Sequence, residues 1–364
     1  MAISTLTTPA VTAGSTSSIL SDAVLSQIKR TLQDHLKSGI VIIIGSGLSC
    51  AEGLPGMKAL TNHLEKAALL TGVGTVEWAT ILQEIKDKGL EGALKTQTVH
   101  EDISNFIRSE IALAVSTAEE HVIAEVITTN RILKFSRLLQ YLPQDNRFAV
   151  ITTNYDRLIE LAAESVGFLV DTRSRGNHFA PFSKSDGSYA FAKNIIQVKG
   201  GIRKIENKVI SLYKPHGSLD WADHQGRPVR CSFNLGSERA LIITPGVSKY
   251  RAGYNQPFDM HRELANEAID KADKLLVIGY GFNDDHLETH LSAKIKSGTQ
   301  TVILAHTLTD NAKSYLTACP NSVWGIEASP SALGTLVHNN NSTYFLENES
   351  LWDTEGFVKG VLEI

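Results

Sequence analysis

Short apolar runs alternate with helical patterns along most of the chain. Runs rich in β-branched and aliphatic residues predict strands at 41–44, 148–152, 241–244, 274–279 and 301–305. Apolar residues at helical spacing predict helices at 21–32, 258–271 and 284–296. Apolar strands that alternate with helices are typical of parallel sheets covered on both faces. The pattern therefore predicts an α/β fold with a Rossmann-like, doubly wound parallel sheet.

The spacing of these runs also divides the chain into regions. Helical periodicity continues from about 57 to 142, too long for a simple crossover, so we predict an inserted helical subdomain there. Glycines and short β-like runs, including 194–198 and 208–212, predict a small β-rich region at about 168–231. We assign the small, hydroxylic residues 1–18 to a flexible N-terminal arm, residues 19–330 to one nucleotide-binding domain, and residues 331–364 to a C-terminal extension.

The strand at 41–44 ends in a glycine-rich loop, Gly45-Ser46-Gly47-Leu48-Ser49, which is followed by Gly53-Leu54-Pro55-Gly56. Such a loop turns tightly, and its free N–H groups beside a helix N-terminus bind anions such as phosphate. It is not a complete dinucleotide fingerprint, because Cys50 occupies the third glycine position, and it is not a P-loop, because no Gly-Lys-Ser/Thr follows. Taken alone, the loop is equally consistent with a tight strand-to-helix turn.

Two further polar motifs follow predicted strands: Thr152-Thr153-Asn154-Tyr155-Asp156 and Gly279-Tyr280-Gly281-Phe282-Asn283. In open parallel sheets, ligands bind beyond the carboxyl ends of the strands, near the point where strand order reverses. We therefore expect Asn154 and Asp156 to contact a ligand. Asp284, by contrast, is expected to cap the helix that follows, because Asp favours that position.

One of the twelve histidines stands apart. His216 lies between Pro215, which stiffens the turn, and Gly217, which allows a close approach, directly after a predicted short strand. An imidazole with an ordinary pKa accepts protons near neutral pH. Although most histidines serve packing or the surface, this setting indicates a positioned general base.

Composition narrows the class of protein. The 364 residues carry a net charge of −4, without the basic excess that nucleic-acid binding favours, so no direct nucleic-acid contact is expected. No apolar run is long enough to span a bilayer, and residues 1–18 lack the features of a secretory signal. The three cysteines are far apart in sequence, which excludes a four-cysteine zinc site, predicts no metal, and fits the reducing cytoplasm.

Taken in order, the motifs from about Val41 to Ala305 resemble the sirtuin family, and more closely the divergent sirtuin-like proteins of bacterial anti-phage defence. The resemblance implies that NAD is the substrate. It implies a pyrophosphate cradle at Gly45, Ser46, Gly47 and Ser49, and further contacts with the cofactor at Pro55 and Thr153. It implies an adenosine site at Gly279, Gly281 and Asn283. By the same resemblance Asn154 orients the ribose or a water, Asp156 holds the nicotinamide amide, and His216 is the general base.

The departures from the family pattern bear on the reaction. The two Cys-x-x-Cys pairs that hold a structural zinc in deacylating sirtuins do not occur, and Thr153 and Tyr155 replace the family's Gln and Ile. We therefore expect hydrolysis of the nicotinamide–ribose bond, giving ADP-ribose or a cyclic form and depleting NAD during abortive infection. The alternatives are an ADP-ribosyl transferase or zinc-free deacylase, and a non-catalytic module that binds NAD or ADP-ribose. The resemblance also implies a homo-oligomer and a controlling partner such as a HerA-like ATPase or a short Argonaute.

Overall fold

The computed structural model describes residues 22–71, 75–96, 100–142, 147–185, 188–233, 236–244, 256–331 and 333–363. The predicted N-terminal arm at 1–18 lies outside these residues. The helices are α1 Asp22–His35, α2 Ser46–Ala51, α3 Met57–Thr71, α4 Thr75–Thr96, α5 Glu101–Thr129, α6 Lys134–Leu139, α7 Leu158–Ser165, α9 Phe258–Lys271, α10 Asp285–Lys296, α11 Asp310–Ala318 and α12 Thr354–Phe357. Short helical turns lie at η1 Ser188–Phe191, η2 Ser237–Arg239 and η3 Val358–Leu362.

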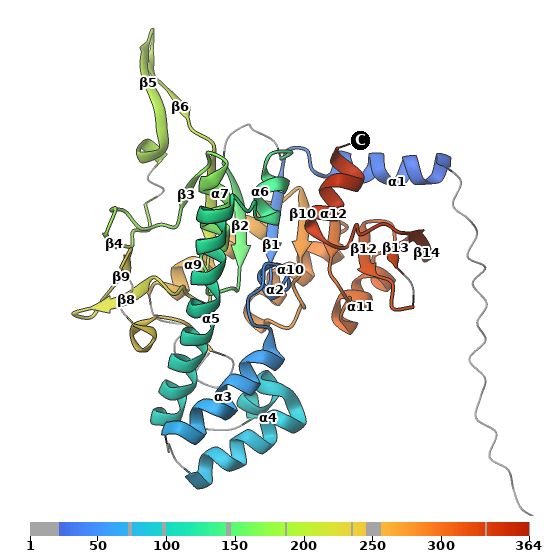
Figure 1. Ribbon diagram of the computed structural model, residues 1–364. Helices are drawn as coiled ribbons and strands as arrows, with labels where there is room; N and C mark the ends of the chain where they lie inside the picture. The colour runs from blue at the N-terminus through green and yellow to red at the C-terminus, as the bar shows by residue number, and fades with distance from the viewer. Residues whose placement is uncertain are drawn as a thin grey trace, which may run out of the picture.

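The strands form one large sheet and two small ones (Figure 1). They are β1 Ile40–Ile44, β2 Arg147–Thr152, β3 Leu169–Asp171, β4 Phe179–Pro181, β5 Ala192–Val198, β6 Gly201–Glu206, β7 Val209–Tyr213, β8 Trp221–His224, β9 Arg227–Cys231, β10 Lys274–Ile278, β11 Gln300–Leu304, β12 Val323–Ala328, β13 Gly334–Asn339 and β14 Ser342–Glu347. The large sheet has the order β14-β13-β12-β11-β10-β1-β2-β7-β3. The small sheets are β4-β9-β8 and β5-β6.

The large sheet confirms the predicted doubly wound architecture. In sheet order, β3, β7, β2, β1, β10, β11 and β12 all run parallel to one another. Only β13, which pairs with β12, and β14, which pairs with β13, are added antiparallel at one edge. The chain runs outward from β1 to β2 and later returns to β10 on the other side of β1, so strand order reverses between β1 and β10. Loops that follow these strands are therefore where a ligand is expected.

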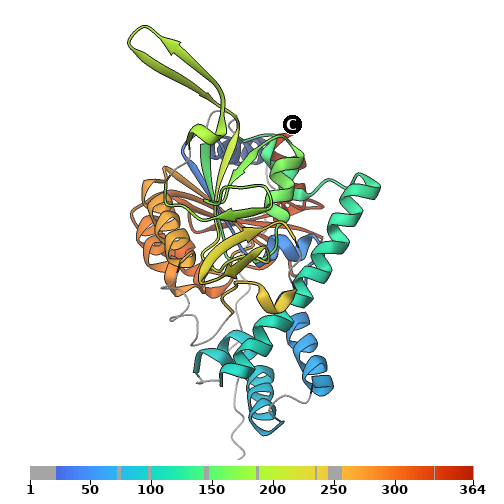
Figure 2. The ribbon, with the colours of Figure 1, turned by 90° about the vertical axis from the view of Figure 1, so that its left-hand side faces the viewer.

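Both faces of the sheet are covered, which explains why β1 is apolar at every position. Ile40, Ile42 and Ile44 belong to the core cluster that includes α1, α5, α6 and α7. Val41 and Ile43 belong to the opposite cluster, which includes α9, α10 and α11. Figure 2 shows these helices on the two sides of the sheet. Burial on both faces selects a run of β-branched residues over an alternating pattern.

Helices α3, α4 and α5 fill the long interval between β1 and β2, where the sequence predicts an inserted helical subdomain. In Figure 1, α3 and α4 lie below the sheet, and the 29-residue α5 runs from them along the body. Among the described residues, no helix is both long enough and apolar enough to cross a bilayer.

One predicted strand does not form, and another forms but joins a different sheet from the one expected. The run 241–244 forms no strand, and Ile242 makes only an isolated bridge with Gly217. The run near 208–212 becomes β7, which joins the large sheet between β2 and β3 and not the small β-rich region, because all five of its residues are buried. Residues 334–347, in the predicted C-terminal extension, add β13 and β14 to the same sheet.

Candidate active site

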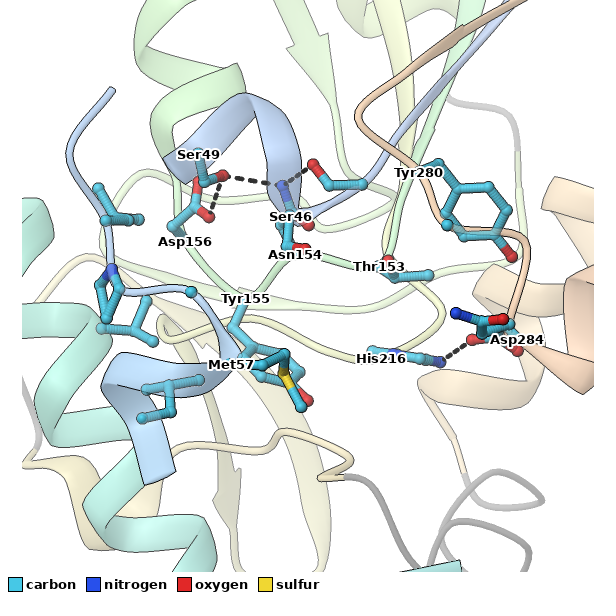
Figure 3. Close-up of a pocket in the computed structure, with 18 of the residues that line it drawn as sticks. Ser46, Ser49, Met57, Thr153, Asn154, Tyr155, Asp156, His216, Tyr280 and Asp284 are labelled. Atoms are coloured by element: carbon cyan, nitrogen blue, oxygen red, sulfur yellow. Dashed lines mark hydrogen bonds and ion pairs between the residues drawn. The ribbon is translucent and has the colours of Figure 1, made fainter. Parts of the chain in front are cut away.

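A cavity of about 270 Å³ opens at the ends of β1, β2 and β10, where strand order reverses. The predicted site residues that line it are Gly45, Ser46, Ser49, Pro55, Thr153, Asn154, Asp156, His216, Gly281 and Asn283. Gly47 and Gly279 are not among its lining residues. Figure 3 shows polar side chains from several loops turned toward this space. The fold thus brings ten of the twelve predicted residues to one cavity.

Gly45, Gly47 and Gly279 serve a contact between two loops. A Cβ on Gly47 would lie 2.7 Å from the Gly279 Cα, and a Cβ on Gly45 would lie 2.4 Å from the Gly279 oxygen. The N–H of Gly47 donates to the Gly279 carbonyl at 3.0 Å, and that of Gly45 donates to Ile278 at 2.9 Å. These glycines allow the loops after β1 and β10 to touch, so their two N–H groups already have protein acceptors. The predicted phosphate contact of Gly45 and Gly47 therefore stays a prediction.

A hydrogen-bonded chain joins the glycine loop to the β2 corner. The Asn154 amide nitrogen donates to the Gly45 carbonyl at 2.9 Å and to Ser49 Oγ at 2.8 Å. Ser49 Oγ donates in turn to Asp156 Oδ2 at 2.7 Å, and Leu158 N donates to Asp156 Oδ1 at 3.2 Å. The side chains of Asn154, Ser49 and Asp156 are all buried. Their orientations are consequently fixed by the protein before any ligand binds.

Both amide hydrogens of Asn154 are donated in these hydrogen bonds, to Gly45 and to Ser49. Within the described part of the molecule, no hydrogen bond to the Asn154 Oδ1 is found, and Asn154 lines the cavity. The carbonyl oxygen of the side chain is thus the atom that can accept from a ligand hydroxyl or a water.

His216 contacts an acidic partner, Asp284, in the lining of the cavity. Its Nε2 forms an ion-pair contact with Asp284 Oδ2, as the dashed line in Figure 3 shows. The side chain of Asp284 is only 6% exposed and that of His216 is 14% exposed. The sequence predicts that Asp284 caps the following helix, and the pairing with His216 was not predicted. A signal existed, since a carboxylate in the loop after β10 lies at the same sheet edge as His216.

A buried lysine supports the loops that carry Asp156 and His216. Lys214 Nζ donates to the Asp156 carbonyl at 2.6 Å, to Ser218 Oγ at 2.9 Å and to Glu160 Oε1 at 3.1 Å. Its side chain is fully buried. Burial raises the pKa of Glu160, and the charge of Lys214 opposes that rise. Lys214 thereby ties the end of β7 to the corner after β2.

The loop after β10 is fastened from α11. The Thr309 hydroxyl donates to the Gly281 carbonyl at 2.8 Å, and the Asn311 amide donates to the Phe282 carbonyl at 2.7 Å and to Asn283 Oδ1 at 2.9 Å. Phe282 has φ of 57°, a left-handed conformation that these bonds help to hold. Thr309 and Asn311 were not predicted as site residues, because they follow a different strand.

Part of the cavity lining is apolar and was not predicted. It includes Leu54, Met57 and Leu60 from the loop and helix after the glycine loop, Val115 from α5, and Ile243. The Tyr155 hydroxyl donates to the Ile243 carbonyl at 2.6 Å, which fixes the segment beside His216. Residues of the helical insertion therefore form part of the cavity, although the insertion lies between strands in the sequence.

Two titratable groups near the cavity are shifted by burial. Desolvation, followed by the charge of Asp156, raises the pKa of the Cys50 thiol, which disfavours the reactive thiolate. Desolvation and then Asp284 raise the pKa of Tyr280. Among the described residues, no group of three His, Cys, Asp or Glu side chains is arranged to hold a metal ion. The amide of Asn154 and the His216–Asp284 pair are among the polar groups that line the cavity.

The fold and the cavity define the class: a doubly wound α/β protein with a partly polar cavity at its topological switch point. Within that class, residues 149–318, just under half of the chain, match the SIR2-like domain. The matched stretch includes Asn154, Asp156, His216 and the loop after β10, and it excludes the glycine loop after β1. A search of curated proteins found no match.

Some solved structures of sirtuins are similar to this chain, at low sequence identity and low TM-score. One, from work on sirtuin substrate affinity, is 13% identical, covering 92% of this chain and 96% of that chain at a TM-score of 0.42. A Sir2 mutant with a p53 peptide and NAD is 15% identical, with 92% and 97% covered and a TM-score of 0.36. A third, on the mechanism and regulation of Sir2 enzymes, is 11% identical, with 79% and 90% covered and a TM-score of 0.35.

Proposed function

We propose that the protein hydrolyses NAD⁺ at the bond between nicotinamide and ribose. The observation that carries the proposal is the placement of Asn154 and the His216–Asp284 pair around one cavity at the switch point of the sheet. The SIR2-like match over residues 149–318 supports NAD as the substrate. On this proposal, the glycine loop and the loop Gly279–Asn283 hold the dinucleotide, and Pro55 and Thr153 border it.

Asn154 would orient the reacting water or ribose. Its amide nitrogen is held by Gly45 and Ser49, so the Oδ1 atom points at a fixed place in the cavity without a rotation at the moment of reaction. A preorganised acceptor of this kind lowers the barrier mainly by positioning the reactant. Asp156, which accepts from Ser49, keeps Ser49 aimed at Asn154 and would hold the nicotinamide amide with its remaining lone pairs.

His216 would remove the proton. When the bond from C1′ of the ribose to the pyridinium nitrogen breaks, its electron pair leaves with nicotinamide, which becomes neutral. A water oxygen bonds to C1′, and the proton of that water passes to His216. The carboxylate of Asp284 stabilises the imidazolium that forms. The balanced result is nicotinamide, ADP-ribose and one proton from NAD⁺ and water.

The apolar wall suits this reaction. Met57, Leu60 and Val115 present hydrocarbon to the cavity, which favours a neutral leaving nicotinamide over the cationic pyridinium and limits the entry of stray water. The chain's lack of paired Cys-x-x-Cys motifs removes the zinc module that accompanies peptide deacylation in the resembling family. Water is therefore the acceptor that we favour.

The test is the time course of NAD loss with purified protein. We expect Asn154→Ala and His216→Ala each to lower nicotinamide release by at least about 100-fold, the range typical for removal of a general base. The matched control is His290→Ala, because His290 is half-exposed on α10 and pairs with Asp270 away from the cavity. Adding an acylated peptide distinguishes the chemistry. Nicotinamide release that requires the peptide would indicate a transferase or deacylase, and tight NAD binding without turnover would indicate a binding module.

We further propose that this activity depletes NAD in the cytoplasm during anti-phage defence, in a homo-oligomer controlled by a partner such as a HerA-like ATPase or a short Argonaute. Uncontrolled NAD hydrolysis is toxic to the cell that makes the enzyme, so a trigger is required. The measurement is cellular NAD after phage infection in cells that express the wild type or Asn154→Ala. A fall of NAD that is equal in both strains would contradict the proposed role.

A further inference from the structure

The peptide bond between Asp156 and Arg157 is held at both of its polar groups by buried charged side chains. Its carbonyl oxygen, on Asp156, accepts from Lys214 Nζ at 2.6 Å. Its N–H, on Arg157, donates to Glu119 Oε1. Lys214 and Glu119 are each 0% exposed. Because a peptide unit is planar, holding both groups fixes the orientation of the whole plane.

Glu119 comes from the helical insertion and not from the sheet. It lies on α5 one helical turn after Val115, which lines the cavity, so the two residues are on the same side of the helix. Its second oxygen, Oε2, accepts from the Arg157 side chain, from Nε at 2.9 Å and from Nη2. One carboxylate therefore binds both the backbone and the guanidinium of Arg157. The guanidinium compensates the negative charge, which burial alone would disfavour.

The corner after β2 needs such an external acceptor, because the N-cap residue of α7 cannot cap the helix. That residue is Arg157, whose side chain carries only hydrogen-bond donors. Asp156 Oδ1 accepts from the N–H of Leu158, the first residue of the helix, at 3.2 Å. The N–H of Arg157 itself has its acceptor in Glu119. Loss of that acceptor would favour rotation of the peptide toward another one.

The orientation of this peptide affects the side chain that precedes it. Asp156 Oδ2 accepts from Ser49 Oγ at 2.7 Å, and Ser49 Oγ accepts from the Asn154 amide at 2.8 Å. A rotation of the peptide changes the backbone at Asp156 and displaces its carboxylate from Ser49. The displacement then reaches Asn154, which loses the partner that orients its amide.

We infer that Glu119 is a positioning residue for the proposed cleavage of NAD. From the helical insertion it holds the peptide after Asp156, and through that peptide it keeps Asn154 in place. The inference rests on the proposed function, which assigns Asn154 to the reaction. Glu119 is not among the lining residues of the cavity, so it acts without touching the substrate. Its effect is therefore expected in kcat and not in KM.

Two double variants isolate the acceptor for this N–H. Glu119→Gln/Arg157→Met keeps an amide oxygen that can accept from the N–H of residue 157, whereas Glu119→Leu/Arg157→Met removes that acceptor. Neither variant leaves a buried charge without its partner, so both are expected to fold. The first should keep a kcat for nicotinamide release within about threefold of the wild type. The second should lower kcat at least about tenfold, with KM changed by less than about twofold.

The matched control is Asp171→Asn. Asp171 is also a buried carboxylate that accepts from a backbone N–H, that of Arg173 at 3.0 Å, and it also pairs with an arginine, Arg147. Arg147 is the first residue of β2, at the end of the strand opposite the cavity. The control should therefore leave kcat unchanged.

Hydrogen–deuterium exchange over residues 154–161 detects the same effect without turnover. The amide at position 157 should exchange at least about tenfold faster in Glu119→Leu/Arg157→Met than in Glu119→Gln/Arg157→Met. A wild type that releases no nicotinamide would contradict the proposed function, and the exchange rates would then decide whether Glu119 holds the peptide. Equal kcat values or equal exchange rates for the two double variants would overturn the inference. So would an equal fall of kcat in Asp171→Asn.

Discussion

Lys214 should contribute more to the free energy of unfolding than any surface ion pair of the protein does, and this contribution should depend on pH. The substitution Lys214→Met leaves Glu160 buried without its cation and removes the bonds to the Asp156 carbonyl and Ser218. A buried carboxyl in that position takes up a proton instead of staying charged. Protonation at pH 7 of a group whose ordinary pKa is 4.5 requires about 3 kcal/mol.

The sign of the pH effect follows from that protonation. In the variant the folded-state pKa of Glu160 lies above its unfolded value, so the penalty is full at high pH and vanishes as the pH falls toward 4.5. The two lost hydrogen bonds add about 1 kcal/mol each at any pH. Because burial already raises the pKa of Glu160 in the wild type, the protonation cost is the most that the substitution can add. We therefore expect Lys214→Met to lower the free energy of unfolding by between about 2 and about 5 kcal/mol at pH 7, and by a smaller amount, at most about 3 kcal/mol, at pH 5.

Urea denaturation with linear extrapolation measures this difference. In the double variant Lys214→Met/Glu160→Gln no carboxyl remains to be protonated, so the loss should be about 2 kcal/mol at both pH values. Equal losses for Lys214→Met at pH 7 and pH 5, or a loss below about 1 kcal/mol at pH 7, would refute the reasoning.

Three further predictions concern the His–Asp pair, the loop contact and buried histidines. Asp284→Asn should lower the kcat for nicotinamide release about 100-fold with little change in KM, measured by steady-state kinetics; an unchanged kcat would exclude the pairing from the mechanism. Gly279→Ala, at φ of 58° with backbone atoms 2.7 Å from the new Cβ, should cost more than about 2 kcal/mol in urea unfolding. Gly298→Ala, at φ of 93° with open space around it, should cost only about 1 kcal/mol, and equal losses would contradict the steric argument. Burial lowers the pKa of His35 to about 4 and that of His261 to about 3. Stability should therefore be full above pH 6.5 and fall by about 2 kcal/mol per histidine at pH 5, and a flat urea midpoint between these values would contradict it.

Much of the sheet could be predicted from the sequence, because strands that are buried on both faces appear there as continuous apolar runs. The run at Ile40–Ile44 is buried throughout, and the helical period at Phe258–Lys271 matches α9 at both ends. The run at 241–244 is equally apolar, yet it makes only a bridge beside Gly217. A short apolar run indicates that a segment is buried. It does not show whether that segment pairs with a neighbouring strand, or with which one.

The site was predictable where each motif ends a strand and was missed where contacts join distant segments. Asn154 and His216 follow strands of the large sheet, and strand ends meet at one edge. The contact of His216 with Asp284 depends on how two loops lie in space, and a helix-cap preference gave the competing interpretation. Likewise Met57 and Val115 reach the cavity only through the packing of the helical insertion, which leaves no local signal.

The central claim is that Asn154 and its cavity break the nicotinamide–ribose bond of NAD. The most direct measurement is chromatographic separation of the products formed from NAD by the purified wild type and by Asn154→Ala, with equal folding verified by circular dichroism. The account predicts nicotinamide and an ADP-ribose species in equal amounts from the wild type, and intact NAD with the variant. Equal turnover by both proteins would contradict it, as would NAD that binds in the cavity of the wild type and is never cleaved.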